Sequence, residues 1–411
     1  MTDELTFRPI EGDELPQFEH CSAIAFHAPT DIGLSARFAH RIELDRTCAA
    51  FENQTIVGTS AALTHHLSVP GGDVPSAGIT WVSVLPTHRR RGILTTMLDQ
   101  LFADALKRGE AVATLWASEA GIYGRFGFGP AAEEARFAID THGVPPLPPD
   151  QNAPPITLQM RDPAGARRVL EPLFERMRMR RPGIVSRTQS WWDERVLADI
   201  KGEREGGTDP RLVIAAANGG VARGYALYRV RDREPNATVT VTELIAPDDA
   251  AAAALWRYLC SLDLVGRIDA PHRPVDDALP FLFPDMRRVG LVEQSDSLWV
   301  RLLDVPAALE QRMWSADAAL TIALTDASMP ANAGTWTIDA VGGMARCTRV
   351  AADTPPDLQL DVCWLGAAYL GGTPLTRLVA AGHVRERTVG AAALLDAALH
   401  VPQAPWSPEK F

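Results

Sequence analysis

Arginine fills three consecutive positions in front of a glycine, at Arg89, Arg90, Arg91 and Gly92. An apolar segment ends just before them at Pro86. After them, apolar residues recur at helical spacing, at Leu94, Met97, Leu98, Leu101, Phe102 and Leu106. A helix start carries unpaired amides and a partial positive charge, and glycine allows a ligand to approach the backbone. The pattern therefore predicts a strand, a basic loop and a helix that bind a pyrophosphate.

A second motif follows the next apolar segment, AVATLWA, in the run ASEAGIYGRFGFG. It places Tyr123 ahead of Gly127 and Phe128 as Tyr-x-x-x-Gly-Phe. The two motifs together resemble the acetyl-CoA site of the GCN5-related N-acetyltransferase (GNAT) family, whose loop reads R/Q-x-x-G-x-G/A. The loop here ends in Leu94 and departs from that pattern in its last position. The resemblance implies acetyl-CoA as the acetyl donor.

The elements that must position these motifs are separated by a proline-rich segment, THGVPPLPPDQNAPP, at residues 141–155. Proline disfavours both helix interiors and central strands, so this segment predicts a linker. The strands and helices before it, which we expect to end with the strand RFAID, predict a mixed α/β sheet. The same order returns after it and indicates a degenerate duplication. A third, α+β block starts near Leu298 and includes an apolar helix in LQLDVCWLGAAYLGG.

Four segments extend the resemblance over nearly the whole chain: THRRRG, WASEAGIYGRFGFG, RTQSWWDERV and LWVRLLDVPAALEQR. They closely resemble the Eis N-acetyltransferases of actinobacteria. The resemblance implies two tandem GNAT-type mixed-sheet domains followed by a sterol-carrier-like domain. We therefore expect a catalytic domain at 1–143, a linker at 144–155, a degenerate GNAT-like domain at 156–297 and a sterol-carrier-like domain at 298–411.

The two copies differ where a cofactor would bind. When they are aligned on Pro86 and Pro247, THRRRGIL lies over DDAAAAAL, so the second copy offers Asp248 and Asp249 followed by alanines where the first offers its arginines. Carboxylates are good caps for a helix start, but they repel a pyrophosphate. The second copy is therefore predicted to bind no CoA.

Acetyl transfer from a thioester to an amine needs a neutral amine, an oxyanion partner and a proton for the thiolate. We expect the backbone of Val82, Ser83 and Val84 to position the thioester by strand-like pairing. The amides from Arg90 to Thr95, through Ile93 and Leu94, would hold the pyrophosphate. The resemblance adds Ser118 and Glu119 as cofactor contacts.

Two residues are predicted to move protons. Tyr123 is suited to be the general acid, since the reference pKa of tyrosine, near 10, roughly matches that of a thiol. The resemblance implies that the terminal carboxylate of Phe411 reaches the first domain's site, as the base or as a group that orients the amine. No metal site is expected, because the adjacent His65 and His66 would face opposite sides of a strand.

Composition limits the partners. A net charge of −11 argues against a nucleic-acid coat and suits a cationic acceptor. Together with the resemblance it predicts an N-acetyltransferase of polycationic amines such as aminoglycosides. Protein lysines or polyamines as acceptors, and a lipid or sterol carrier with a vestigial transferase, are the alternatives. No apolar run is long enough to span a membrane and no signal peptide is visible, so we expect a cytoplasmic protein. The resemblance implies a homo-oligomer, a homohexamer.

Overall fold

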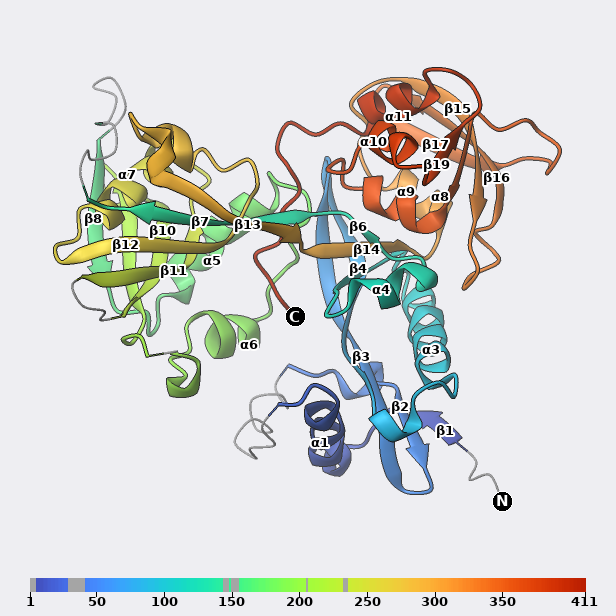
Figure 1. The fold of residues 1–411 in the computed structure, drawn as a ribbon, viewed down its shortest axis with the longest axis horizontal. Helices are drawn as coiled ribbons and strands as arrows, with labels where there is room; N and C mark the ends of the chain where they lie inside the picture. The colour runs from blue at the N-terminus through green and yellow to red at the C-terminus, as the bar shows by residue number, and fades with distance from the viewer. Residues whose placement is uncertain (1–4, 29–40, 143–147, 149–154, 205, 232–235) are drawn as a thin grey trace. The chain divides into compact units, whose positions relative to one another are not determined.

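The computed structural model describes residues 5–28, 41–142, 148, 155–204, 206–231 and 236–411. The chain divides into two compact units (Figure 1). The first consists of Met1–Ala131, Leu298–Pro402 and Lys410–Phe411, and the second of Ala132–Ser297 and Gln403–Glu409. Each unit is therefore built from segments that lie far apart in the sequence.

The first unit contains a seven-stranded mixed sheet in the order β1-β2-β3-β4-β5-β14-β6. Its strands are β1 (Leu5–Arg8), β2 (Ala49–Glu52), β3 (Thr55–Val69), β4 (Gly72–Val84), β5 (Val112–Trp116), β14 (Leu298–Leu302) and β6 (Gly129–Pro130). Most neighbours are antiparallel, but β4 and β5 run parallel, with helix α3 (Ile93–Lys107) as the connection between them. The mixed sheet predicted from the sequence is confirmed.

Two helices cover this sheet, and alternating residues of its strands face them. The cluster under α3 includes Val57, Ala77 and Leu115, whereas Ile56 belongs to the cluster under α1 (Leu15–Ala25). The short helix α4 (Ala120–Tyr123) follows β5. This arrangement sets the start of α3 and the start of α4 directly after the parallel strands β4 and β5.

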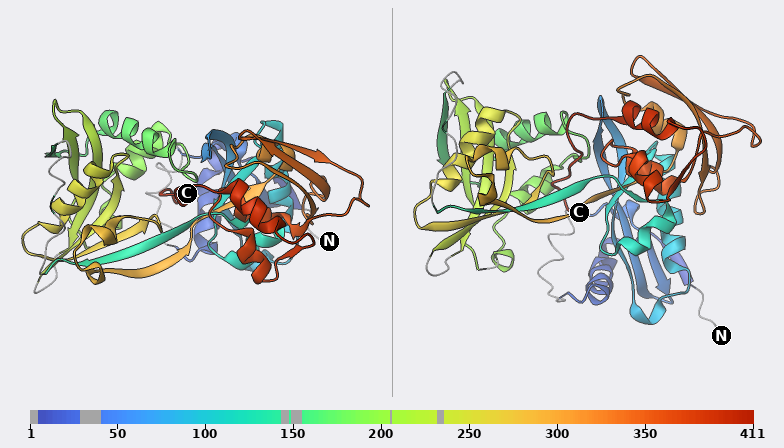
Figure 2. Two further views of the ribbon diagram at one scale, coloured as in Figure 1. Left: turned by 90° about the horizontal axis from the view of Figure 1, so that it is seen from above. Right: turned by 45° about the horizontal axis from the view of Figure 1, so that its top comes forward.

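A five-stranded sheet completes the first unit, in the order β17-β16-β15-β18-β19. Its strands are β15 (Ala318–Thr325), β16 (Gly334–Val341), β17 (Met344–Arg349), β18 (Leu358–Asp361) and β19 (Val384–Glu386). The helices of this part are α8 (Val305–Glu310), α9 (Val362–Ala368), α10 (Leu375–Ala380) and α11 (Ala391–Leu399). They pack beside the sheet, orange to red in Figure 2.

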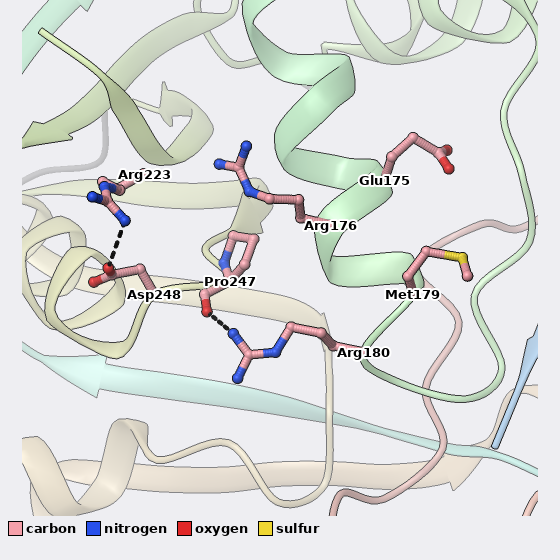
Figure 3. Close-up of a pocket in the computed structure, with 7 residues that line it drawn as sticks. All are labelled: Glu175, Arg176, Met179, Arg180, Arg223, Pro247 and Asp248. Atoms are coloured by element: carbon pink, nitrogen blue, oxygen red, sulfur yellow. Dashed lines mark hydrogen bonds and ion pairs between the residues drawn. The ribbon is translucent and has the colours of Figure 1, made fainter. Parts of the chain in front are cut away.

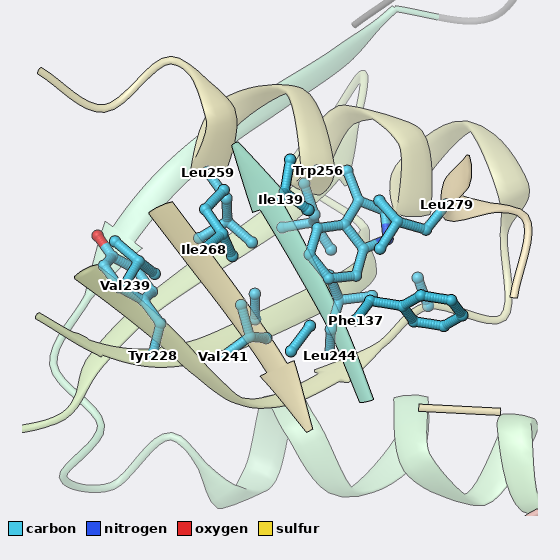
Figure 4. Packing of buried hydrophobic residues seen from close by; sticks show 14 of the residues in the cluster. Phe137, Ile139, Tyr228, Val239, Val241, Leu244, Trp256, Leu259, Ile268 and Leu279 are labelled. Atoms are coloured by element: carbon cyan, nitrogen blue, oxygen red, sulfur yellow. The ribbon is translucent and has the colours of Figure 1, made fainter. Parts of the chain in front are cut away.

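The second unit is built on another seven-stranded sheet, in the order β13-β7-β12-β11-β10-β9-β8. Its strands are β7 (Glu133–Asp140), β8 (Ile156–Arg161), β9 (Arg211–Ala217), β10 (Ala222–Arg231), β11 (Ala237–Ile245), β12 (Val265–Arg273) and β13 (Val289–Asp296). Helix α7 (Asp249–Cys260) packs on the cluster that holds Trp256, Phe137 and Ile139 (Figure 4). Helix α5 (Arg167–Arg178) packs on the other face. Trp192, beside the short helix α6 (Gln189–Trp191), is fully buried in this cluster.

One expectation about the strands needs correction. The segment RFAID was expected in the first sheet, but β7, which contains it, pairs with β12 and β13 of the second. In the first sheet, β14 from beyond the second copy pairs with β5 and β6. A local pattern specifies that a segment is a strand but not which strand it pairs with. Residues 143–147 and 149–154 of the predicted linker lie outside the described residues.

The helix expected over LQLDVCWLGAAYLGG is wrong in its first part. Leu358 and Leu360 are buried in alternation on β18, and α9 begins only at Val362. The carboxylate of Asp361 accepts a hydrogen bond from the amide of Cys363 and so caps α9 at its start. In the part of the chain that the structure describes, no helix has the length and apolar character needed to cross a membrane.

Candidate acetyl-CoA site

The N-terminus of α3 is open to a ligand. Its cap residue is Gly92, which has a φ of 79° and makes no side-chain cap hydrogen bond. Gly92 is exposed, and nothing lies within 4 Å of the position that a Cβ would occupy there. The helix is anchored behind this end by Ile93, Met97 and Leu98, which are buried. The first amides of α3 therefore keep their hydrogen-bonding capacity and the positive end of the helix dipole faces outward.

The basic loop is positioned by a residue that the sequence did not single out. Glu52, the last residue of β2, accepts hydrogen bonds from Arg91 Nη2 at 2.9 Å and contacts His88 Nε2 at 3.0 Å. The hydrogen bond from His88, followed by that from Arg91, lowers the pKa of the Glu52 carboxyl. Arg89 and Arg90 are exposed. The loop thus has one arginine tied to the sheet and two in solvent beside the helix start.

The strands in front of the loop separate. The parallel pairing of β4 with β5 covers Ser76–Gly78 and Val112–Thr114 and stops there among the described residues. Beyond it, β4 bulges against β3, and Trp81 has a φ of 48°. The backbone at 82–84 consequently has no β5 partner, which leaves groups free for an extended ligand. Val82 and Val84 are half-buried, whereas the hydroxyl of Ser83 contacts that of Thr59 at 2.6 Å.

Tyr123 ends α4, directly after the second of these strands. Its side chain is 5% exposed and lies edge-on to Phe128, with the ring centroids 6.1 Å apart. Burial raises the pKa of Tyr123; a hydrogen bond to Ser118 opposes this shift and the charge of Glu119 adds to it. Ser118 and Glu119 are themselves exposed. The hydroxyl of Tyr123 therefore stays protonated at neutral pH and can donate a proton.

The other residue predicted to transfer protons, Phe411, lies in the same unit. Its ring packs edge-on against the ring of His65 on β3, with centroids 4.8 Å apart. Nearby, the ammonium of Lys410 lies 5.4 Å from the centre of the Trp116 ring at the end of β5. The last two residues of the chain are thus held against the first sheet.

The second copy has a different helix start. The carboxylate of Asp248 accepts a hydrogen bond from the amide of Ala251 at 3.0 Å and caps α7, which confirms the capping expected there. A pocket of about 570 Å³ lies beside this end, between α5 and α7 (Figure 3). Its basic residues are partly engaged: Arg223 lies 3.8 Å from Asp248 and Arg180 donates to the carbonyl of Pro247. An anion there would meet the Asp248 carboxylate.

Family models match the chain in three places. Residues 6–131 and 183–302 each match an acetyltransferase (GNAT) domain, and residues 305–408 match a sterol carrier protein domain. The three-part fold predicted from the sequence, with two GNAT-type domains and a sterol-carrier-like domain, is confirmed.

Relatives are similar over most of their length. An uncharacterized N-acetyltransferase of Streptomyces avermitilis is 40% identical over 378 residues, 90% of each chain. The N-acetyltransferase Eis of Mycobacterium tuberculosis is 35% identical over 353 residues, 84% of this chain and 83% of its own. The crystal structure of Eis1 from Mycobacterium abscessus aligns with a TM-score of 0.85 at 33% identity, covering 99% of this chain and 100% of that one. The chain therefore belongs to the Eis family of GCN5-related N-acetyltransferases.

Proposed function

We propose that the first GNAT copy transfers the acetyl group of acetyl-CoA to amines of polycationic acceptors, of which aminoglycosides are the leading class. The observation that carries this proposal is the uncapped start of α3 at Gly92, which stands beside three arginines and directly after the separated strands. The free amides and the arginines suit the pyrophosphate. The edge of the Val82–Val84 backbone that faces away from β3 lacks a β5 partner and suits the extended pantetheine arm.

The reaction is a direct attack. The nitrogen of the acceptor amine bonds to the thioester carbon, the carbon–sulfur bond breaks, and the thiolate takes the proton of Tyr123. A backbone amide of the β4 segment stabilises the oxyanion that forms in between. The proton of the amine passes to water beside the carboxylate of Phe411. A terminal carboxyl has a reference pKa of about 3.5, so we propose that it mainly orients the amine.

The net charge of the chain and the activity named for its relatives support this choice of acceptor. The chain has a net charge of −11, which draws cations toward it, and its named relatives are N-acetyltransferases. Protein lysines and polyamines share the same cationic amine chemistry.

The homohexamer and the cytoplasmic location expected from the sequence stay predictions. Light scattering after size-exclusion chromatography tests the homohexamer.

The experiment mixes the full chain with acetyl-CoA and a panel of aminoglycosides, polyamines and a lysine-rich peptide. A thiol reagent follows the release of CoA, and mass spectrometry counts the acetyl groups added. We expect acceptor-dependent release with at least one aminoglycoside. Release with the peptide alone would redirect the proposal to protein lysines. No release with any amine, together with saturable binding of a fatty acid or sterol, would instead support the carrier.

A further inference from the structure

The ring of Phe411 packs against a strand of the first sheet. It meets the His65 ring edge-on, at 78° between the planes and 4.8 Å between centroids. His65 is 5% exposed on β3, in register with Ser76 of β4. The contact therefore joins Phe411 to a buried strand residue that is far from it in the sequence.

Gly78 leaves the space that this contact needs. A Cβ at Gly78 would lie 2.6 Å from Nδ1 of His65 and 3.2 Å from a ring carbon of Phe411. Gly78 lies on β4, the strand that continues to Val82. Any larger residue would push the His65 and Phe411 rings away from the strand.

His65 is unsuited to the transfer of protons. Burial, and to a lesser extent the charge of Arg46, lowers the pKa of His65 to about 3. Its Nδ1 is buried and has no hydrogen-bond partner among the described residues. A neutral ring forms no ion pair with the carboxylate of Phe411, so the contact between the two residues is one of ring packing.

We propose that His65 is a positioning residue which, with Gly78, forms a seat for the ring of Phe411 and so fixes where the terminal carboxylate lies. This inference rests on the function proposed above for that carboxylate. A carboxylate on a frayed end samples many positions, and misplacement by about 1 Å can cost a hundredfold in rate. The ammonium of Lys410 lies over the ring of Trp116 and so restrains the residue directly before Phe411.

The test measures the release of Phe411 by carboxypeptidase A from the folded full chain, beside kcat and the Kd for acetyl-CoA. His65→Ala empties the seat and Gly78→Ala fills it, so both variants should release Phe411 at least about tenfold faster. Both should lower kcat by roughly ten- to a hundredfold and leave the Kd for acetyl-CoA unchanged. His65→Phe keeps a ring in place and should stay within about twofold of the wild type in each measurement.

His66→Ala is the matched control, because the side chain of His66 is 52% exposed and faces the other side of the strand. It should change neither the release nor kcat. If Phe411 is released at the wild-type rate from both His65→Ala and Gly78→Ala, the proposal that these residues form its seat is wrong. Faster release with unchanged kcat overturns the positioning role. If removal of Phe411 from the wild type leaves turnover intact, the function proposed for the carboxylate fails, whatever the release rates of the variants.

Discussion

Tyr123, the proposed general acid, lies in a buried environment. The side chain is packed among Phe126 and Phe128, and this environment raises the pKa of its hydroxyl. The hydroxyl therefore stays protonated through the neutral range, and in the proposed mechanism it is the proton donor to the departing thiolate. The same packing leaves the ring little freedom. Removal of the hydroxyl alone should therefore lower the reaction rate and leave the structure unchanged.

Tyr123→Phe is therefore expected to lower kcat about a hundredfold or more, which is the typical contribution of general acid catalysis. The Kd for acetyl-CoA should stay within about twofold, because the pyrophosphate contacts at α3 are untouched. Steady-state release of CoA and isothermal titration calorimetry measure the two quantities. Full turnover in this variant would contradict the assignment of Tyr123 as the acid.

We expect Glu409 to make the stability of the second unit depend on pH. Its side chain is buried and paired with Arg187, which also pairs with Glu243. Burial, with the nearby charge of Glu243 acting in the same direction, raises the pKa of Glu409 from 4.5 to about 7. A carboxyl with a raised pKa binds its proton more tightly in the folded state than in the unfolded state. Its ionisation therefore costs stability as pH rises from about 4.5 to about 7.

Glu409→Gln removes this ionisation. The melting temperature of the wild type relative to this variant should be higher at pH 5 than at pH 8, since each unit of pKa shift corresponds to about 1.4 kcal/mol. Differential scanning fluorimetry at both pH values measures the difference. Glu293→Gln, at an exposed site on β13, is the control and should show no such trend. A wild-type advantage that grows toward pH 8 would contradict the raised pKa.

Among the elements, the starts of α3 and α7 differ in how their first amides are capped. Gly92 leaves the amides of α3 free, whereas Asp248 engages an amide of α7 with its carboxylate. Free amides at a helix start favour an anion, whereas at α7 the carboxylate of Asp248 already accepts a hydrogen bond from one of these amides. This contrast predicts that a carboxylate introduced at Gly92 would make the first copy resemble the second.

Gly92→Asp should weaken the binding of acetyl-CoA by about ten- to a hundredfold, the size expected for repulsion between a carboxylate and a pyrophosphate near a protein surface. Gly92→Asn is the matched control: it has the same shape without the charge, and asparagine tolerates a positive φ. Titration calorimetry compares the two variants. Equal affinity in both would show that charge at this position does not decide binding.

The local patterns of the sequence predicted α3, its basic loop and the capped start of α7, because each depends on residues close together in the chain. They did not predict that Glu52 ties Arg91 or that His65 meets Phe411, since these contacts join residues far apart in sequence. They also placed the strand RFAID in the wrong sheet. Strand partners depend on tertiary packing, which no local pattern contains.

At the scale of the whole molecule, the exchange of strands makes the first sheet depend on a distant segment. β14 pairs with β5 along its full length, and its Trp299 belongs to the core under α3. A fragment of residues 1–143 lacks this strand and leaves β5 as an unpaired apolar edge. It should not unfold cooperatively by circular dichroism and should aggregate.

Residues 298–411 supply β14, so co-expression of this segment with residues 1–143 should yield a soluble complex that co-purifies. Sedimentation and circular dichroism distinguish the two preparations. A fragment 1–143 that is monomeric and unfolds cooperatively alone would contradict the structural role of β14.

We propose that the first GNAT copy binds acetyl-CoA and that the second does not. Calorimetric titration of the full chain with acetyl-CoA tests this directly, because it counts the binding sites per chain. We expect one site per chain. Two sites per chain, or none, would contradict this assignment.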